Sequence, residues 1–154
     1  MERDMKTIEL QLPSRLGYER VAMDAAGAAA KLIGFHTSRI EDLRTAVAEA
    51  CINAIEHAHK FNSTMKVVVA LNIGDDHLMI DVTDQGEGMP ESVEPPDMER
   101  KFAGEQQARG WGMFLIKALM DEVEFNVHSD QGNATRMVIR LDPHAVDDRR
   151  PLPV

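Results

Sequence analysis

The stretch MKVVVALNIGDDHLMIDVTD, residues 65–84, decides the fold class of this chain. Its first part is mostly apolar. Its second part alternates Leu78, Ile80 and Val82 with more polar neighbours, which is the period of a strand with one buried face. The short turn GDD between the two parts predicts a hairpin of antiparallel strands. A second hairpin is predicted at 122–141, around the turn DQGN.

One further strand and three helices complete the predicted elements. Alternating apolar residues near the N-terminus predict the strand, and an alanine-rich segment predicts a helix at about 14–32. Ser38 and Glu41 have the spacing of a capping box, which predicts a second helix from there to about Lys60. A dense apolar segment that opens at Gly110 predicts the third helix.

This order of elements predicts a two-layer α/β sandwich of the α+β type. Tight turns join successive strands, so the sheet is expected to be mostly antiparallel, with helices covering one face and the other face more open. The length of 154 residues fits one domain, expected at residues 1–142. The aperiodic segment 91–109 is long enough for a lid, and the polar tail 143–154 is expected to be disordered.

The composition excludes several classes of function. A net charge of −9 argues against nucleic-acid binding, because contacts with phosphates need a basic face. The single cysteine, Cys51, cannot form an internal disulfide, which predicts a reducing compartment. No apolar run approaches the roughly 20 residues that span a bilayer, and the N-terminus lacks an apolar signal core. We therefore expect a soluble cytoplasmic protein without membrane contact.

Two glycines follow the first hairpin in DQGEGM, residues 84–89, and three familiar motifs do not fit them. A dinucleotide fingerprint needs a third glycine, and a phosphate-binding loop needs a lysine after its last glycine. A calcium loop that began at Asp81 would have Ser92 at its twelfth position, where a glutamate is required.

An acid beside glycines at a strand end fits recognition of a flat base. Asp84 can accept a hydrogen bond from an exocyclic amine such as that of adenine, and we expect it at the strand end, outside the core. Glycine lets the backbone approach a ring because it has no Cβ. The alternative is an ordinary surface turn, since aspartate and glycine dominate turns.

The segment EACINAIEHAHK, residues 49–60, places an acid and an amide on one helical face. Glu49 and Asn53 are one turn apart, and Glu56 and Lys60 continue their face. An amide oxygen is a suitable ligand for Mg²⁺, and a carboxylate can take a proton from an attacking hydroxyl. The face lies opposite the apolar stripe of the predicted helix, so the alternative is a solvated surface with i,i+4 pairs.

The segment RGWGMFL, residues 109–115, carries two more glycines where the third helix is expected to begin. Backbone N–H groups of Gly110 and Gly112 at a helix N-terminus can face phosphate oxygens, and Arg109 adds a positive charge. The alternative is an ordinary N-terminal turn.

In this order the three segments resemble the motifs of the GHKL ATPase superfamily, which includes gyrase, Hsp90, histidine kinases and MutL. Glu49 and Asn53 match its N box, residues 84–88 match its D-x-G-x-G box, and residues 110–112 match its G-x-G box. Within the superfamily, EACINAIEHAH and GWGMFLIKALMDEVEF resemble the anti-sigma factor serine-protein kinases of the RsbW type. Glu56 stands where histidine-kinase relatives often have lysine, which disfavours that branch.

The resemblance implies a Bergerat fold with a mixed, mostly antiparallel sheet, and it implies roles for individual residues. Asp84 would accept the adenine amino group, Asn53 would hold Mg²⁺ against the phosphates of ATP, and Glu49 would be the general base. The segment 91–109 would be a lid over the nucleotide. The residues expected to bind the nucleotide are Asn53, His57, Asp84, Gly86, Gly88, Met89, Arg109, Gly110, Trp111, Gly112 and Met113.

The resemblance implies a serine kinase that transfers the γ-phosphate of ATP to a STAS-domain antagonist protein. The same protein would bind a sigma factor, and the family likeness suggests a homodimer. An ATP-sensing regulator that changes partners without phosphate transfer is the alternative. The catalytic half of a two-component system ranks last, because the segment before the first strand is too short for a phosphoacceptor hairpin. Asn133 follows Gly132 where many relatives have threonine, which affects one contact on the adenine side.

Overall fold

The computed structural model describes residues 5–60, 62, 64–85, 105–129 and 132–141, without the side chains of 57, 58, 105–110, 128 and 129. The elements in chain order are β1 (Lys6–Pro13), α1 (Glu19–Ile33), α2 (Thr37–Asn53), the π-helical turn η1 (Ala54–Ala58), β2 (Lys66–Ile73), β3 (His77–Asp84), α3 (Glu105–Leu119), β4 (Glu122–Ser129) and β5 (Gly132–Arg140).

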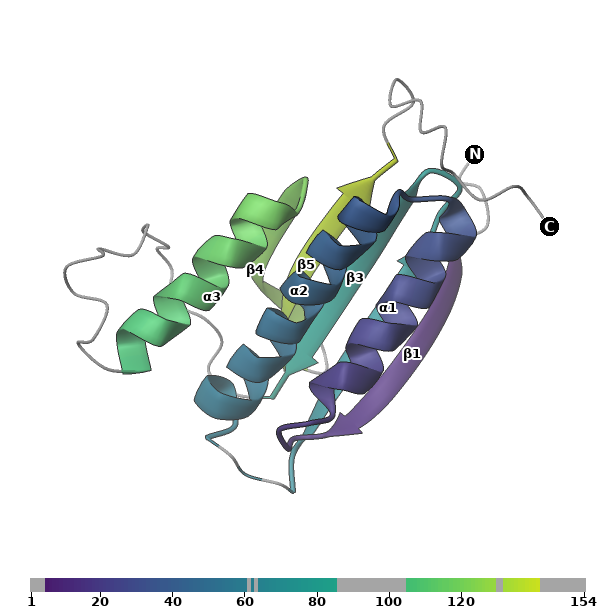
Figure 1. Cartoon of the computed structure of the whole chain (residues 1–154). Coiled ribbons are helices and arrows are strands. Elements are labelled where there is room, and N and C mark those ends of the chain that lie inside the picture. The colour runs from purple at the N-terminus through teal and green to yellow at the C-terminus, as the bar shows by residue number, and fades with distance from the viewer. Residues whose placement is uncertain (1–4, 61, 63, 86–104, 130–131, 142–154) are drawn as a thin grey trace.

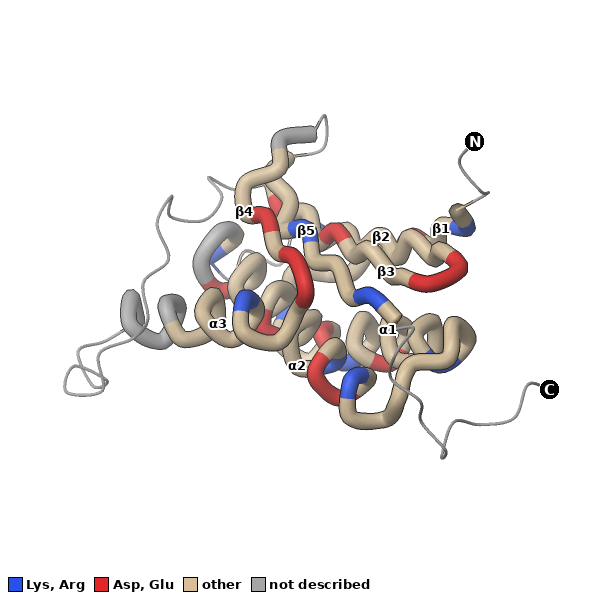
Figure 2. Tube along the Cα trace, turned by 90° about the horizontal axis from the view of Figure 1, so that it is seen from above, with Lys and Arg blue, Asp and Glu red and all other residues tan. Residues whose placement is uncertain are grey.

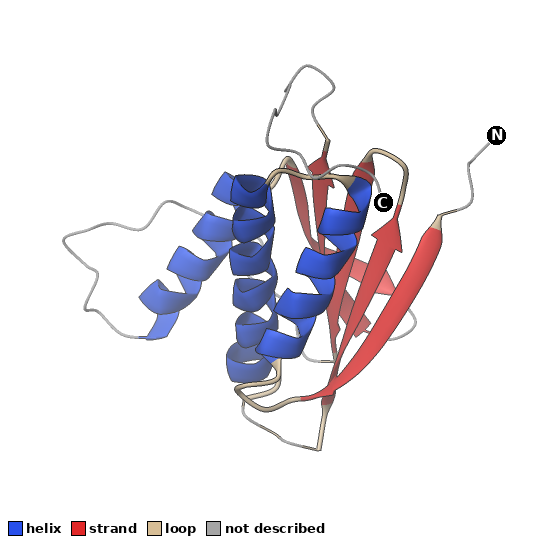
Figure 3. Cartoon of the chain, turned by 45° about the vertical axis from the view of Figure 1, so that its right-hand side comes forward, coloured by secondary structure: helices blue, strands red, loops and turns tan. Residues whose placement is uncertain are grey.

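The described elements form two layers, a sheet and a set of helices on one of its faces. Helices α1, α2 and α3 lie in front of the strands, with α2 in the middle (Figure 1). The same separation is visible from the side in Figure 3 and from above in Figure 2, where strands and helices occupy opposite halves of the picture. The predicted two-layer α+β sandwich is confirmed.

The sheet has five strands in the order β1-β2-β3-β5-β4. All four neighbouring pairs are antiparallel, so the sheet of the described strands is entirely antiparallel rather than mixed. In the two central pairs, Leu71 lies opposite Ile80 and Ile80 lies opposite Met137. This row of side chains is fully buried, whereas the neighbouring row contains the ion pair of Asp81 with Arg136, whose Nε donates to Oδ1 over 2.9 Å. The alternation therefore gives one face to the core and leaves the other open.

The helices bury small and branched side chains against this row. The buried face of α1 is alanine-rich, which allows α1 and α2 to approach closely. Gly27 belongs to that face, and Arg44 of α2 packs over it. The start of α2 is joined to the end of α3, because Arg39 donates to the carbonyl of Leu119 over 2.9 Å. The helical layer is therefore held together across segments that lie far apart in the sequence.

Two features predicted for the helix ends are wrong. Helix α1 begins at Glu19 rather than near Ser14, because residues before it form turns. The capping box does not form: the N-cap of α2 is His36, whose Nδ1 accepts the Ser38 N–H over 3.0 Å. An imidazole nitrogen satisfies the same free amide that a serine hydroxyl would. The predicted end near Lys60 is close to the observed one, because the regular part of α2 ends at Asn53 and η1 continues the helical segment to Ala58.

The start of α3 also differs from the prediction, since the helix begins at Glu105 and not at Gly110. Residues 105–109, EQQAR, are all strong helix formers. They extend the helix on the N-terminal side of the two glycines. The backbones of Gly110 and Gly112 consequently lie inside the helix in this structure. The last five residues of the expected lid belong to α3, and the rest of it, 91–104, lies outside the described residues.

Candidate functional site

Asn53 and the nearby Glu49 lie towards the C-terminal end of α2, between the other two helices. Asn53 is 3% exposed, and its Nδ2 has no hydrogen-bond partner among the residues that the structure describes. Glu49 is half-buried. The alternative of a solvated face is therefore wrong at these positions, because α3 packs against this side of α2. A buried amide without a partner is costly to a fold, which is typical of a group that binds a ligand.

Gly112 of α3 lies directly over these two side chains. A Cβ added there would lie 2.8 Å from Oε2 of Glu49, and 3.2 and 3.3 Å from Nδ2 and Oδ1 of Asn53. Any side chain at this position would therefore push into the acid and the amide. The segments 49–60 and 109–115, which are about 60 residues apart in the sequence, therefore meet in one place.

The environment of Glu49 favours a proton acceptor. Burial raises the pKa of the Glu49 carboxyl above its ordinary value, and the nearby charge of Glu56 raises it further. A carboxylate with a raised pKa is a stronger base than an exposed one, which suits general-base catalysis.

Asp84 is the last residue of β3, and it continues the row of Leu78, Ile80 and Val82 that faces the helices. It is 3% exposed, so the expectation that it stands outside the core is wrong. Gly132 of β5 lies against its backbone with φ +133°, and a Cβ there would lie 2.0 Å from the Asp84 carbonyl oxygen. Only glycine fits at this position without moving the strand end.

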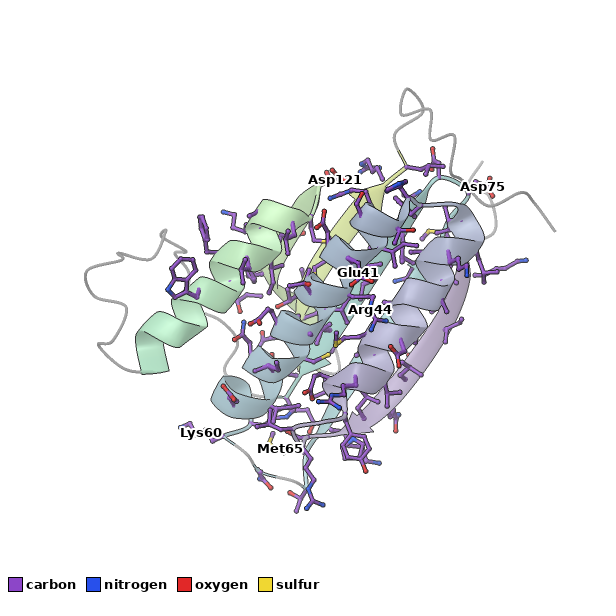
Figure 4. All side chains as sticks on the ribbon, in the orientation of Figure 1. Glu41, Arg44, Lys60, Met65, Asp75 and Asp121 are labelled. Atoms are coloured by element: carbon purple, nitrogen blue, oxygen red, sulfur yellow. The ribbon has the colours of Figure 1, made fainter. Side chains whose placement is uncertain are left out.

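His59 connects the end of η1 to the residue after Asp84. The Gln85 N–H donates to its Nε2 over 3.1 Å, and its Nδ1 lies 2.8 Å from Oγ of Ser14. Because η1 begins directly after Asn53, this contact brings the Asp84 segment to the same end of the sandwich as the acid and the amide. Lys60 and Met65 mark that end in Figure 4, with Asp75 and Asp121 at the opposite end.

For the other predicted residues, the structure gives fewer contacts or none. Met113 is buried, and the ring of Trp111 meets that of Phe114 edge-on at 6.1 Å. The side chains of His57 and Arg109 are not among those described, and for Gly110 only the helical backbone is described, so the roles of these residues remain predictions. Three further predicted residues lie outside the described residues, namely Gly86, Gly88 and Met89.

The residues fit a magnesium ion that is shared with a nucleotide. Among the residues that the structure describes, no group of three or more His, Cys, Asp or Glu side chains could hold a metal alone. Mg²⁺ is commonly bound by one or two protein oxygens together with substrate phosphates, and the buried amide of Asn53 can supply one of them. The absence of a hydrogen-bond partner for Asn53 Nδ2 among the described residues is consistent with this arrangement.

Sequence reasoning missed two groups at this site. The sequence predicts Ser14 at the start of a helix and His59 within the second helix, with no role for either, yet both are buried and bonded to each other. No local signal distinguishes His59 from His57 in HAHK. Their contact joins segments 45 residues apart, so only the tertiary structure shows it.

Comparison with known proteins agrees with this geometry. A family model described as a histidine kinase-like ATPase domain matches residues 12–139. A crystal structure of the RsbU and RsbW domains of a Mycobacterium tuberculosis protein is similar in fold, with a TM-score of 0.61 at 22% identity. That match covers 88% of this chain and 32% of the longer one.

Curated relatives are similar over almost their whole length. Serine-protein kinase RsbW of Bacillus licheniformis is 32% identical over 152 residues, covering 96% of this chain and 94% of the relative. The protein of the same name from Bacillus subtilis is 28% identical over 151 residues, covering 96% and 93%. The chain therefore belongs to the histidine kinase-like ATPase family and, within it, to the serine-protein kinases of the RsbW type. The predicted class of enzyme, an ATP-dependent protein serine kinase, is confirmed.

Within the described residues, no helix combines the length and the apolar character needed to cross a bilayer.

Proposed function

We propose that the chain transfers the γ-phosphate of ATP to a serine hydroxyl of a STAS-domain antagonist protein. The serine oxygen attacks the γ-phosphorus, the bond to the β-phosphate oxygen breaks, and ADP leaves. The serine proton passes to the carboxylate of Glu49. Bound Mg²⁺, held by Asn53 and the phosphates, would neutralise charge on the transferred group.

The single observation that carries this proposal is the contact of three segments at one end of the sandwich. The backbone of α3 at Gly112 lies against Glu49 and Asn53, which brings the third segment beside the groups that would face the phosphates. Asp84 lies beyond η1 on the same side of the sheet, where its carboxylate can accept the adenine amino group. The base of one nucleotide is thereby assigned to the end of β3, and its phosphates are assigned to α2 and α3.

We also propose that a sigma factor and the antagonist compete for this protein. Phosphorylation of the antagonist would weaken its binding and free the kinase for the sigma factor, and the ratio of ADP to ATP would bias the exchange. Such partners place the protein in the cytoplasm, which agrees with its one unpaired cysteine, Cys51. A homodimer remains a proposal from the family likeness.

Transfer of label from [γ-³²P]ATP tests the proposed reaction. The purified protein is incubated with a STAS-domain acceptor, beside an acceptor in which the target serine is alanine. Label is expected on the serine protein alone and only with Mg²⁺ present. If no label moves although the acceptor still binds in a nucleotide-dependent way, the protein is an ATP-sensing regulator without transferase activity.

Two substitutions should separate recognition of the base from binding of the metal. Asp84→Asn is expected to weaken ATP binding by about 10- to 100-fold, because a hydrogen bond to a charged group is lost. Asn53→Ala is expected to abolish the gain in affinity that Mg²⁺ gives, with a smaller effect on metal-free binding. Calorimetric titration with and without Mg²⁺ measures both. An identical pattern in the two variants would contradict the assigned division of roles.

The pH dependence of kcat/KM should report the environment of Glu49. The base must be ionised, so activity is expected to rise with pH through the raised pKa of Glu49. Glu56→Gln removes the smaller of the two causes of that shift, so the acid limb should move to lower pH while burial keeps it above the ordinary glutamate value. Glu41→Gln, on an exposed part of α2, is the control and should leave the limb in place. An acid limb unmoved in Glu56→Gln would show that another group sets it.

A further inference from the structure

His59 occupies a buried position between three segments of the chain. It is 2% exposed and caps the C-terminal end of η1, where its own N–H donates to the Ala54 carbonyl over 2.9 Å. Its ring contacts Ser14, just after β1, and Gln85, just after β3. The residue therefore joins the ends of two strands to the end of the α2–η1 segment.

The contacts define the state of the ring. Nε2 accepts the Gln85 N–H, so it carries no proton. In a neutral ring the proton is then on Nδ1, which donates to Oγ of Ser14 over 2.8 Å. Burial lowers the pKa of His59, which favours this neutral form. Ser14 is itself fixed, because its N–H donates to the Met65 carbonyl over 3.1 Å.

The bond to Gln85 acts on the backbone directly after Asp84. On its other side, the same strand end is confined by Gly132, which approaches the Asp84 carbonyl closely. The Asp84 backbone is thus held from β5 on one side and from η1 on the other. Loss of the His59 acceptor would leave the Gln85 N–H without this partner and release the restraint that η1 places on the strand end.

We propose that His59 is a positioning residue for nucleotide recognition, which holds the end of β3 so that Asp84 presents its carboxylate to the base. This proposal rests on the proposed function, because it assigns Asp84 to adenine. It concerns binding of the nucleotide and not the transfer of phosphate. The two hydrogen bonds described for the ring go to Ser14 and Gln85, on the side of the Asp84 segment.

Steady-state kinetics of two His59 variants test the proposal. His59→Leu replaces the ring by an apolar side chain of similar size and so removes both ring nitrogens. It is expected to raise KM for ATP by about ten-fold, and to lower the preference for ATP over GTP, with kcat at saturating ATP unchanged. His59→Gln offers an amide oxygen to Gln85 and an amide N–H to Ser14, so most of the affinity should return. His77→Leu, at the opposite end of the sheet beside Asp76, is the matched control and should not change KM.

Each outcome has a defined meaning. A merely structural role would reduce the amount of active enzyme, which lowers kcat and leaves KM unchanged, and that result would overturn the proposal. Equal losses in the leucine and glutamine variants would also overturn it. If the wild-type protein does not bind ATP, the proposed function fails; if it binds ATP and His59→Leu binds equally well, only the positioning role fails.

A measurement on the wild-type protein covers the case in which His59→Leu does not fold. The Gln85 amide proton is expected to exchange slowly with solvent in the ATP-free protein, because it is bonded to the ring of His59. Exchange at the rate of an open loop would overturn the proposal.

Discussion

Glutamine in place of Glu49 is expected to lower the rate of phosphate transfer to serine by roughly 10²- to 10⁴-fold. Glutamine has nearly the same shape but cannot accept the serine proton. Because the substitution preserves the packing against Gly112, the affinity for ATP should change little. Single-turnover transfer of label to the acceptor, together with a nucleotide titration, measures the two quantities separately.

Glu41→Gln is the matched control for this substitution. Glu41 lies on the same helix, exposed, with its Oε1 3.8 Å from Nε of Arg44 (Figure 4). Removing its charge should leave transfer at the wild-type rate. If Glu49→Gln transfers phosphate normally, another group accepts the proton; if its affinity for ATP falls in parallel with the rate, Glu49 binds the nucleotide and does not act as the base.

Alanine in place of Gly112 should damage activity without damaging the fold. Alanine is favoured over glycine inside a helix by about 1 kcal/mol, and the new Cβ meets the flexible end of Glu49 rather than backbone. The melting temperature is therefore expected to stay the same or to rise. The displaced carboxylate and amide no longer match the reacting groups, and a shift of about 1 Å can cost about 10²-fold in rate.

Gly27→Ala provides the comparison, since it makes the same change in α1. Its Cβ would lie 3.4 Å from Nη1 of Arg44, and its three nearest atoms all belong to Arg44 rather than to Glu49 or Asn53. It should give a similar gain in stability with unchanged transfer. Thermal unfolding and the transfer assay are measured on both variants. Full activity in Gly112→Ala would mean that α3 does not pack on Glu49 and Asn53 when the protein works.

The layers and strands could be predicted from the sequence because their signals are local. Alternation in residues 78–82 fixes which side of β3 is buried, and the short turn at 74–76 fixes the antiparallel pairing. The same period carries one step further to Asp84, which predicts that it faces the helices. Because aspartate and glycine are common in turns, the sequence around Asp84 instead indicates an exposed position at the strand end.

The environment of the site could not be predicted because it depends on distant packing. The burial of Asn53 results from α3, which begins more than 50 residues later. The start of α3 was missed since two glycines suggested a boundary, whereas five helix formers before them extend the helix. The π-helical turn η1 has no local signal, and without it the position of His59 cannot be derived.

The central claim is that three distant segments of this chain form one ATP site. A crystal structure of the wild-type protein with Mg²⁺ and a non-hydrolysable ATP analogue tests it most directly. We predict that the carboxylate of Asp84 accepts a hydrogen bond from the adenine amino group, with the phosphates beside Asn53 and Gly112. A nucleotide bound elsewhere, or bound here without contact between Asp84 and the base, would contradict the claim.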